Sequence, residues 1–215
     1  MAVMDGLLGL VGLRRDSTGG SVQTQLHANQ KGELLVAGGL PPYTEAVRKA
    51  SAWATMSTSA VAGLVVRPST TAAFEIFNNY SYGGKSLIID RLFWFNLVSA
   101  QVAQGFTGWA AVTAAKAAVT SGSFTVRGAS GKAYGGPVIA AASTTVLDSG
   151  WFPWAVGSTK AIEATVTPNG GAVADVGGRL IVPPQCSLCL HAVAQTTAST
   201  FTQGASWFEE QLDIE

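Results

Sequence analysis

The sequence carries little charge. Only 12% of its 215 residues are charged, about half the share of an average soluble domain. Thirteen Lys and Arg residues balance thirteen Asp and Glu residues, so the formal net charge is zero. Binding nucleic acid through a broad basic face needs surplus Lys and Arg, so the sequence predicts no direct nucleic-acid partner. Because a monomer with so few charges is poorly soluble, we expect uncharged surface to be buried against other subunits.

Cysteine is also scarce, and long apolar runs are missing. Cys186 and Cys189 provide no disulfide framework for a chain of this length. They have CxxC spacing, but zinc normally takes four ligands and there is no second pair, so we interpret both as small buried hydrophobic residues. No stretch reaches the roughly 18 consecutive apolar residues that span a bilayer, and we expect no membrane partner. The sequence predicts no metal, because zinc ligands are too few and a calcium loop is missing. It predicts no cofactor, because the glycine motifs that bind phosphates and dinucleotides are missing.

Groups suited to catalysis are few. Alternation along a predicted strand places Cys189 and His191 on the same face, where a nucleophile and a base could be neighbours. No nucleophile elbow accompanies them, and we favour a structural histidine. Glu75 and Asp90 are single acids in apolar strands, which is more typical of structural contacts than of an acid–base pair. The sequence therefore predicts a protein that is not an enzyme.

Small and β-branched residues are abundant, together with 25 glycines and 8 prolines. This composition is typical of short strands joined by tight turns. One short helix is predicted, at residues 43–50. Strands are predicted at residues 53–59, 61–66, 72–78, 86–99, 106–112, 123–127, 138–147, 160–167, 179–182, 187–194 and 205–210. This pattern predicts an all-β fold, an antiparallel β-sandwich of the jelly-roll type, with a barrel as the alternative.

The first 40 residues differ from the rest of the chain. We predict that residues 1–40 form an extended N-terminal arm and that residues 41–215 form the sandwich domain. Large apolar residues lie on a glycine-interrupted stretch of the arm, at Leu7, Leu8, Leu10, Val11 and Leu13. An extended segment cannot bury these side chains by itself. We therefore expect the arm to pack against the main domain or to exchange with a neighbouring subunit, and we assign these five residues to an assembly interface.

A second candidate interface lies in a strand that is apolar on both faces. Alternation places Phe93 and Phe95 on one face and Leu92 and Trp94 on the other. Such a strand is central in a sandwich, covered by another subunit, or both. We accordingly add Phe93, Trp94 and Phe95 to the predicted assembly interface.

Three tryptophans suggest an alternative function. Trp151 and Trp154 fall in a turn-like segment, and Trp109 precedes them in a predicted strand. Exposed tryptophans in loops could stack on sugar rings, as in a glycan-binding, lectin-like module. A packed corner or an interface anchor is the commoner role for such clusters, so glycan binding remains the alternative.

Several stretches resemble a group of phage proteins encoded near virion genes. They are LPPYTEAVR at residues 40–48, FNN at 77–79, GGKSLIIDRL at 83–92 and WFEE at 207–210. The similarity runs from about Ser21 to the end. It resembles jelly-roll virion subunits, in which a strand-paired N-terminal arm precedes an eight-stranded sandwich.

The resemblance implies a non-enzymatic structural protein of the phage particle. Such a protein assembles with copies of itself, as a trimer or a pentamer, and contacts other virion proteins. Many capsid proteins that face packaged genome carry a strongly basic arm, whereas this arm has only Arg14 and Arg15 near its start. This departure favours a shell, vertex, decoration or fibre-base role over genome binding.

Overall fold

The computed structural model describes residues 13–15, 21–23, 43–98, 104–113, 122–143, 146–159 and 170–212. The chain divides into two units, Met1–Pro42 and Tyr43–Glu215. In the first unit, β1 (Leu13–Arg15) and β2 (Ser21–Gln23) form a two-stranded antiparallel sheet. Four of the predicted arm contacts lie outside the described residues, namely Leu7, Leu8, Leu10 and Val11, as does the strand predicted at residues 160–167.

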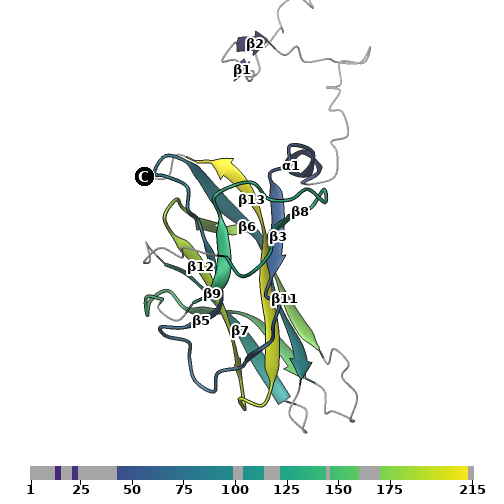
Figure 1. Cartoon of the computed structure of the whole chain (residues 1–215), viewed down its shortest axis with the longest axis vertical. Coiled ribbons are helices and arrows are strands. Elements are labelled where there is room, and N and C mark those ends of the chain that lie inside the picture. The colour runs from purple at the N-terminus through teal and green to yellow at the C-terminus, as the bar shows by residue number, and fades with distance from the viewer. Residues whose placement is uncertain are drawn as a thin grey trace, which may run out of the picture. The chain divides into compact units, whose positions relative to one another are not determined.

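The described part of the second unit contains one short helix and eleven strands (Figure 1). They are α1 (Thr44–Arg48), β3 (Ala52–Met56), β4 (Val61–Ala62), β5 (Ala72–Phe77), β6 (Lys85–Val98), β7 (Gln104–Thr113), β8 (Arg127–Gly128), β9 (Ile139–Ser143), β10 (Phe152–Thr159), β11 (Gly171–Val182), β12 (Ser187–Ala194) and β13 (Thr200–Gln211). The strands form a five-stranded sheet, ordered β10-β7-β12-β5-β9, and a six-stranded sheet, in which β11-β6-β13-β3-β8 are neighbours in that order and β4 also pairs with β13. The two antiparallel sheets pack face to face, which confirms the predicted β-sandwich.

Eight of these strands pair in the order of a jelly roll. Along the chain they are β3, β5, β6, β7, β10, β11, β12 and β13. The first pairs with the eighth, the second with the seventh, the third with the sixth and the fourth with the fifth. This is the pairing of one long hairpin folded over into two sheets. The extra strands β8 and β9, which lie between β7 and β10 in sequence, each extend one edge of a sheet.

The core lies between the two sheets. Leu92 and Trp94 of β6 are fully buried there, opposite the strands of the other sheet. The Trp94 ring lies against Gly108 of β7, where an added Cβ would be 2.4 Å from Trp94 Cδ2. The missing side chain at Gly108 therefore makes room for the indole between the sheets.

Several strands differ in extent from the prediction, and two of the differences have a clear physical reason. Residues 150–154 were expected to be turn-like, yet β10 begins at Phe152 and includes Pro153. Proline lacks an N–H donor but is tolerated in β10, because this strand lies at the edge of its sheet. β11 begins at Gly171, well before the predicted residues 179–182, and its register shifts at Gly177 and Gly178, whose φ angles are 56° and 81°. A glycine pair that suggests a turn is in fact a bulge within one strand.

Candidate functional site

The outer face of the five-stranded sheet is covered by the chain itself. Val146 and Trp151 pack with Ala111 and Cys189 of the sheet in a second buried cluster. Trp151 Nε1 donates a 2.9 Å hydrogen bond to the Ser69 carbonyl. Nearby, Val146 N donates a 2.7 Å hydrogen bond to the Thr70 carbonyl, and Arg67 pairs with Asp148 at 2.7 Å. We call residues 146–151 the cover segment.

Polar groups are buried on this covered face. Ser187 Oγ donates a 2.7 Å hydrogen bond to Glu75 Oε1, and Glu75 is fully buried. Cys189 is the cross-strand neighbour of Glu75, and His191 follows on the same face of β12, as the alternation predicts. Burial lowers the pKa of His191 below its ordinary value of 6.5.

The burial of these polar groups is typical of residues with a structural role. Cys189 and Glu75 are fully buried, and His191 is nearly so, so a substrate has no direct access to them in this structure. Cys186 and Cys189 form no disulfide with each other, and Cys186 is half-buried just before β12. Within the described residues, no group of three or more His, Cys, Asp or Glu side chains is placed to hold a metal ion.

Among the described residues, those that cover the outer face of the six-stranded sheet lie at one end of it. There, Phe208 of β13 has Ala52 and Ile88 as cross-strand neighbours. The Tyr43 ring stacks on Phe208 with a centroid separation of 4.6 Å and an interplanar angle of 12°. Tyr43 immediately precedes α1, so the start of the sandwich domain covers this end of the sheet.

At the other end of the same face, large apolar side chains are exposed within the described part of the chain. Four neighbouring strands place Met56, Gly204, Phe93 and Val173 in one row across the sheet. Phe95 lies two residues further along β6, on the same face. Met56, Phe95 and Val173 are 39%, 37% and 53% exposed, and Phe93 is half-buried. We call Met56, Phe93, Phe95 and Val173 the open patch.

The open patch contains two of the three sandwich residues predicted for assembly. Phe93 and Phe95 lie on it, as alternation predicts. Trp94 does not, because its side chain points into the core and is fully buried. The assignment of Trp94 to an assembly surface is therefore wrong for this structure, and its role is packing between the sheets.

A polar row borders the open patch. Arg91 and Asp175 are cross-strand neighbours next to Phe93 and Val173, and Arg91 Nε lies 2.8 Å from Asp175 Oδ1. Asp90 lies behind them, where Ser206 Oγ donates a 3.4 Å hydrogen bond to its carboxylate and Arg91 Nε is 4.0 Å away. The border thus presents a cation and an anion side by side.

The three tryptophans of the predicted glycan platform do not share one exposed face. Trp151 is buried in the cover segment, and Trp109 packs against the same cluster. Trp154 packs instead against the core between the sheets, and the Arg179 guanidinium lies 5.5 Å from the centre of its ring. A sugar ring would therefore meet no common aromatic platform here.

A buried carboxylate joins distant parts of the chain near the sandwich core. Glu209 of β13 accepts hydrogen bonds from the Tyr134 hydroxyl at 2.7 Å and from the Tyr80 hydroxyl at 2.9 Å. Lys85 Nζ lies 3.8 Å from the same carboxylate. The sequence contained no signal for this cluster, because its members are far apart in the chain.

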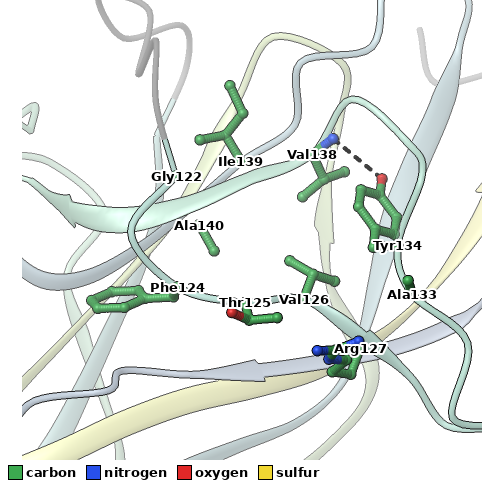
Figure 2. A pocket seen from close by; sticks show the side chains of 10 residues that line it. All are labelled: Gly122, Phe124, Thr125, Val126, Arg127, Ala133, Tyr134, Val138, Ile139 and Ala140. Carbon is green, nitrogen blue, oxygen red and sulfur yellow. Dashed lines mark hydrogen bonds between the residues drawn. The ribbon is translucent and has the colours of Figure 1, made fainter.

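Tyr134 also lines a pocket of about 290 Å³ between residues 122–127 and 133–140 (Figure 2). Its hydroxyl accepts a 3.2 Å hydrogen bond from Val138 N. Since that hydroxyl also donates to Glu209, both of its hydrogen bonds stabilise the folded chain. The remaining lining is mixed and includes Phe124, Val126 and Ile139 together with Thr125 and Arg127.

Comparisons with models of protein families, with curated proteins and with solved structures find no match to this chain. The helix α1 has five residues, and no helix in the described part of the chain is long and apolar enough to cross a membrane. Functional inference therefore depends on the strand order and on the two outer sheet faces.

Proposed function

We propose that this protein is a non-enzymatic structural subunit of a phage particle, and that it assembles with copies of itself. The observation that carries this proposal is the open patch on a jelly-roll sandwich whose opposite outer face is covered by its own chain. Jelly rolls build viral capsid subunits, and also lectins and cupins. The resemblance of several stretches to phage virion proteins favours the first of these uses.

The placement of polar groups supports a structural role over a catalytic one. Glu75, Cys189 and His191 are buried, and Cys189 packs with Val146 and Trp151 of the cover segment. The low charge of the chain favours burial of uncharged surface between subunits. The open patch offers such a surface, because its residues are apolar and lie across the neighbouring strands β3, β13, β6 and β11.

Removing the open patch tests the proposal. We expect the full chain to form oligomers or larger assemblies, visible by light scattering and electron microscopy. The double variant Phe93→Ser with Phe95→Ser keeps Trp94 and the core, so it should retain the circular dichroism spectrum of the parent and assemble poorly. The matched control is Val65→Ser with Val66→Ser, since both valines are exposed outside the open patch.

Two results would contradict the proposal. One is a parent chain that stays monomeric at high micromolar concentration. The other is the absence of its peptides from purified particles, measured by mass spectrometry. Copy number relative to the major shell protein then separates the roles: hundreds of copies indicate shell or decoration, and a few dozen indicate a vertex or fibre base.

A further inference from the structure

We propose that the open patch binds the open patch of a second copy of this chain across a twofold axis, and that Arg91 of each copy pairs with Asp175 of the other. This inference rests on the proposed function, because it names the partner and the geometry of one contact in the assembly. It is carried by the shape of the patch and by the arrangement of charge at its border.

The open patch is flattened by glycines on the strands beside β6. An added Cβ at Gly204 would lie 2.4 Å from Phe93 Cε2, and one at Gly171 would lie 2.4 Å from Phe95 Cδ1. Each ring therefore lies over a neighbouring glycine instead of standing away from the sheet. A flat apolar sheet face is suited to packing against another sheet face, at the usual separation of about 10 Å.

The charges at the border suit a copy of the same surface. In a twofold interface, a residue that contacts a second residue of the partner is itself contacted by that residue's counterpart. Arg91 and Asp175 lie side by side and are 58% and 79% exposed in their side chains. A copy rotated by a half turn can present its anion to this cation and its cation to this anion.

Other charged groups at the border leave this pairing available. Asp90 is largely buried while accepting a hydrogen bond from Ser206. The Arg179 guanidinium donates a hydrogen bond to the backbone carbonyl of Asp175 and leaves the Asp175 carboxylate to Arg91. Partners with charge of a single sign, such as nucleic acid or an anionic membrane, would meet Asp175 as well as Arg91. The mixed border therefore favours a second copy, which carries the same mixture.

The test exchanges charge between two variants. Arg91→Asp and Asp175→Arg each place like charges next to each other within a chain, and also across the proposed interface between identical copies. Each variant alone should self-associate at least about tenfold more weakly than the parent, measured by analytical ultracentrifugation. An equimolar mixture of the two restores opposite charges across the interface only, so it should form a heterodimer of near-parental affinity.

A matched pair elsewhere controls for general charge effects. Arg67 and Asp148 form an exposed ion pair on the opposite side of the sandwich. Their charged atoms are 2.7 Å apart, close to the 2.8 Å between Arg91 and Asp175. Arg67→Asp and Asp148→Arg should each self-associate like the parent. Their mixture should show no preference for heterodimers. Circular dichroism of every variant checks that the sandwich remains folded.

The outcomes separate this inference from the proposed function. If the parent self-associates but the Arg91 and Asp175 variants do so equally well, the interface lies elsewhere and only the twofold contact is overturned. The same conclusion follows if both variants are weakened but their mixture forms no heterodimer. If the parent is monomeric at every concentration, both proposals fail.

Discussion

The Tyr134 hydroxyl donates a 2.7 Å hydrogen bond to Glu209, which links the segment between β8 and β9 to the last strand of the sandwich. Tyr80 donates to the other oxygen of the same carboxylate at 2.9 Å. The Glu209 side chain is only 3% exposed, so these hydroxyls replace water as its hydrogen-bond donors. A buried carboxylate that lost one of them would be left partly unsatisfied.

Removal of the Tyr134 hydroxyl should therefore destabilise the fold. We expect Tyr134→Phe to lower the free energy of unfolding by about 1–3 kcal/mol, the cost of leaving a buried polar partner unpaired. Urea denaturation measures this change. Tyr82→Phe is the control, because Tyr82 is 82% exposed, and it should unfold like the parent. Equal stability of the two variants would show that the Glu209 cluster contributes nothing.

The same cluster predicts a loss of stability at high pH. Burial, followed by the hydrogen bond to Glu209 and its charge, raises the pKa of Tyr80 from 10.0 to about 12, and the same causes raise the pKa of Tyr134. The folded protein then keeps these protons at a pH where the unfolded chain has released them. The stabilisation is complete below pH 10 and is lost as the pH rises toward 12.

Urea denaturation at a series of pH values above 9 tests this dependence. The double variant Tyr80→Phe with Tyr134→Phe should show a shallower decline in stability than the parent. Tyrosinate absorbance gives an independent measurement, because the double variant should lack the two late-titrating phenols. A decline of the same slope in both proteins would place the cause outside the Glu209 cluster.

Composition and turn signals predicted the class of fold, and alternation predicted the two faces of β6. Leu92 and Trp94 enter the core while Phe93 and Phe95 face outward, because strand residues alternate. What alternation cannot supply is which of the two faces of a strand packs against the other sheet. For that reason Trp94 was assigned to a surface although it lies in the core.

The remaining errors have a common physical origin in long-range contacts. Trp151 looks like a loop aromatic, but its burial depends on Ser69, which is distant in the sequence. The proximity of Tyr80, Tyr134 and Glu209 likewise exists only once the strands have paired. Local residue patterns do not encode such contacts, whereas they do encode alternation and turns.

Packing between the sheets gives another prediction, at Gly108. A methyl group there would lie 2.4 Å from Trp94 Cδ2, so Gly108→Ala should force the indole or the sheets to shift. We expect a loss of about 1–3 kcal/mol in unfolding free energy, typical of overpacked cores. Gly105→Ala is the control on the same strand, because its nearest neighbour would be the Gly157 carbonyl oxygen at 3.9 Å. Comparable destabilisation by both variants would argue against this steric explanation.

The cover segment predicts a different result for Trp151. Trp151→Ala removes a buried ring and its hydrogen bond to Ser69, so it should cost about 3–5 kcal/mol of stability. In a Cys186→Ser background, it should also increase the rate at which Cys189 reacts with a thiol reagent, because the cover is weakened. Val156→Ala, at a position 81% exposed, should change neither quantity. A Trp151→Ala protein of parental stability that lost affinity on a glycan array would instead support glycan binding.

The last prediction concerns the N-terminal arm. We expect deletion of residues 1–20 to leave a folded sandwich that assembles poorly. The chain divides at Pro42, so the jelly-roll strands belong to a separate unit. Burial of Leu7, Leu8 and the other large apolar residues of the arm contributes roughly 1.5–3 kcal/mol each when complete, before the entropy of ordering is subtracted.

The net stabilisation left after the entropy of ordering is subtracted is small for one subunit, but it is repeated at every contact of a closed ring. Circular dichroism should show an intact β-sheet spectrum for the truncated chain, and light scattering should show smaller particles than the full chain forms. An arm that instead anchors the protein to a membrane surface predicts normal assembly of the truncated chain and loss of binding to liposomes. An arm that holds subunits together is tested by assembly, and an arm that anchors the protein is tested by liposome binding. If the truncated chain assembles as well as the full chain, the arm does not hold subunits together.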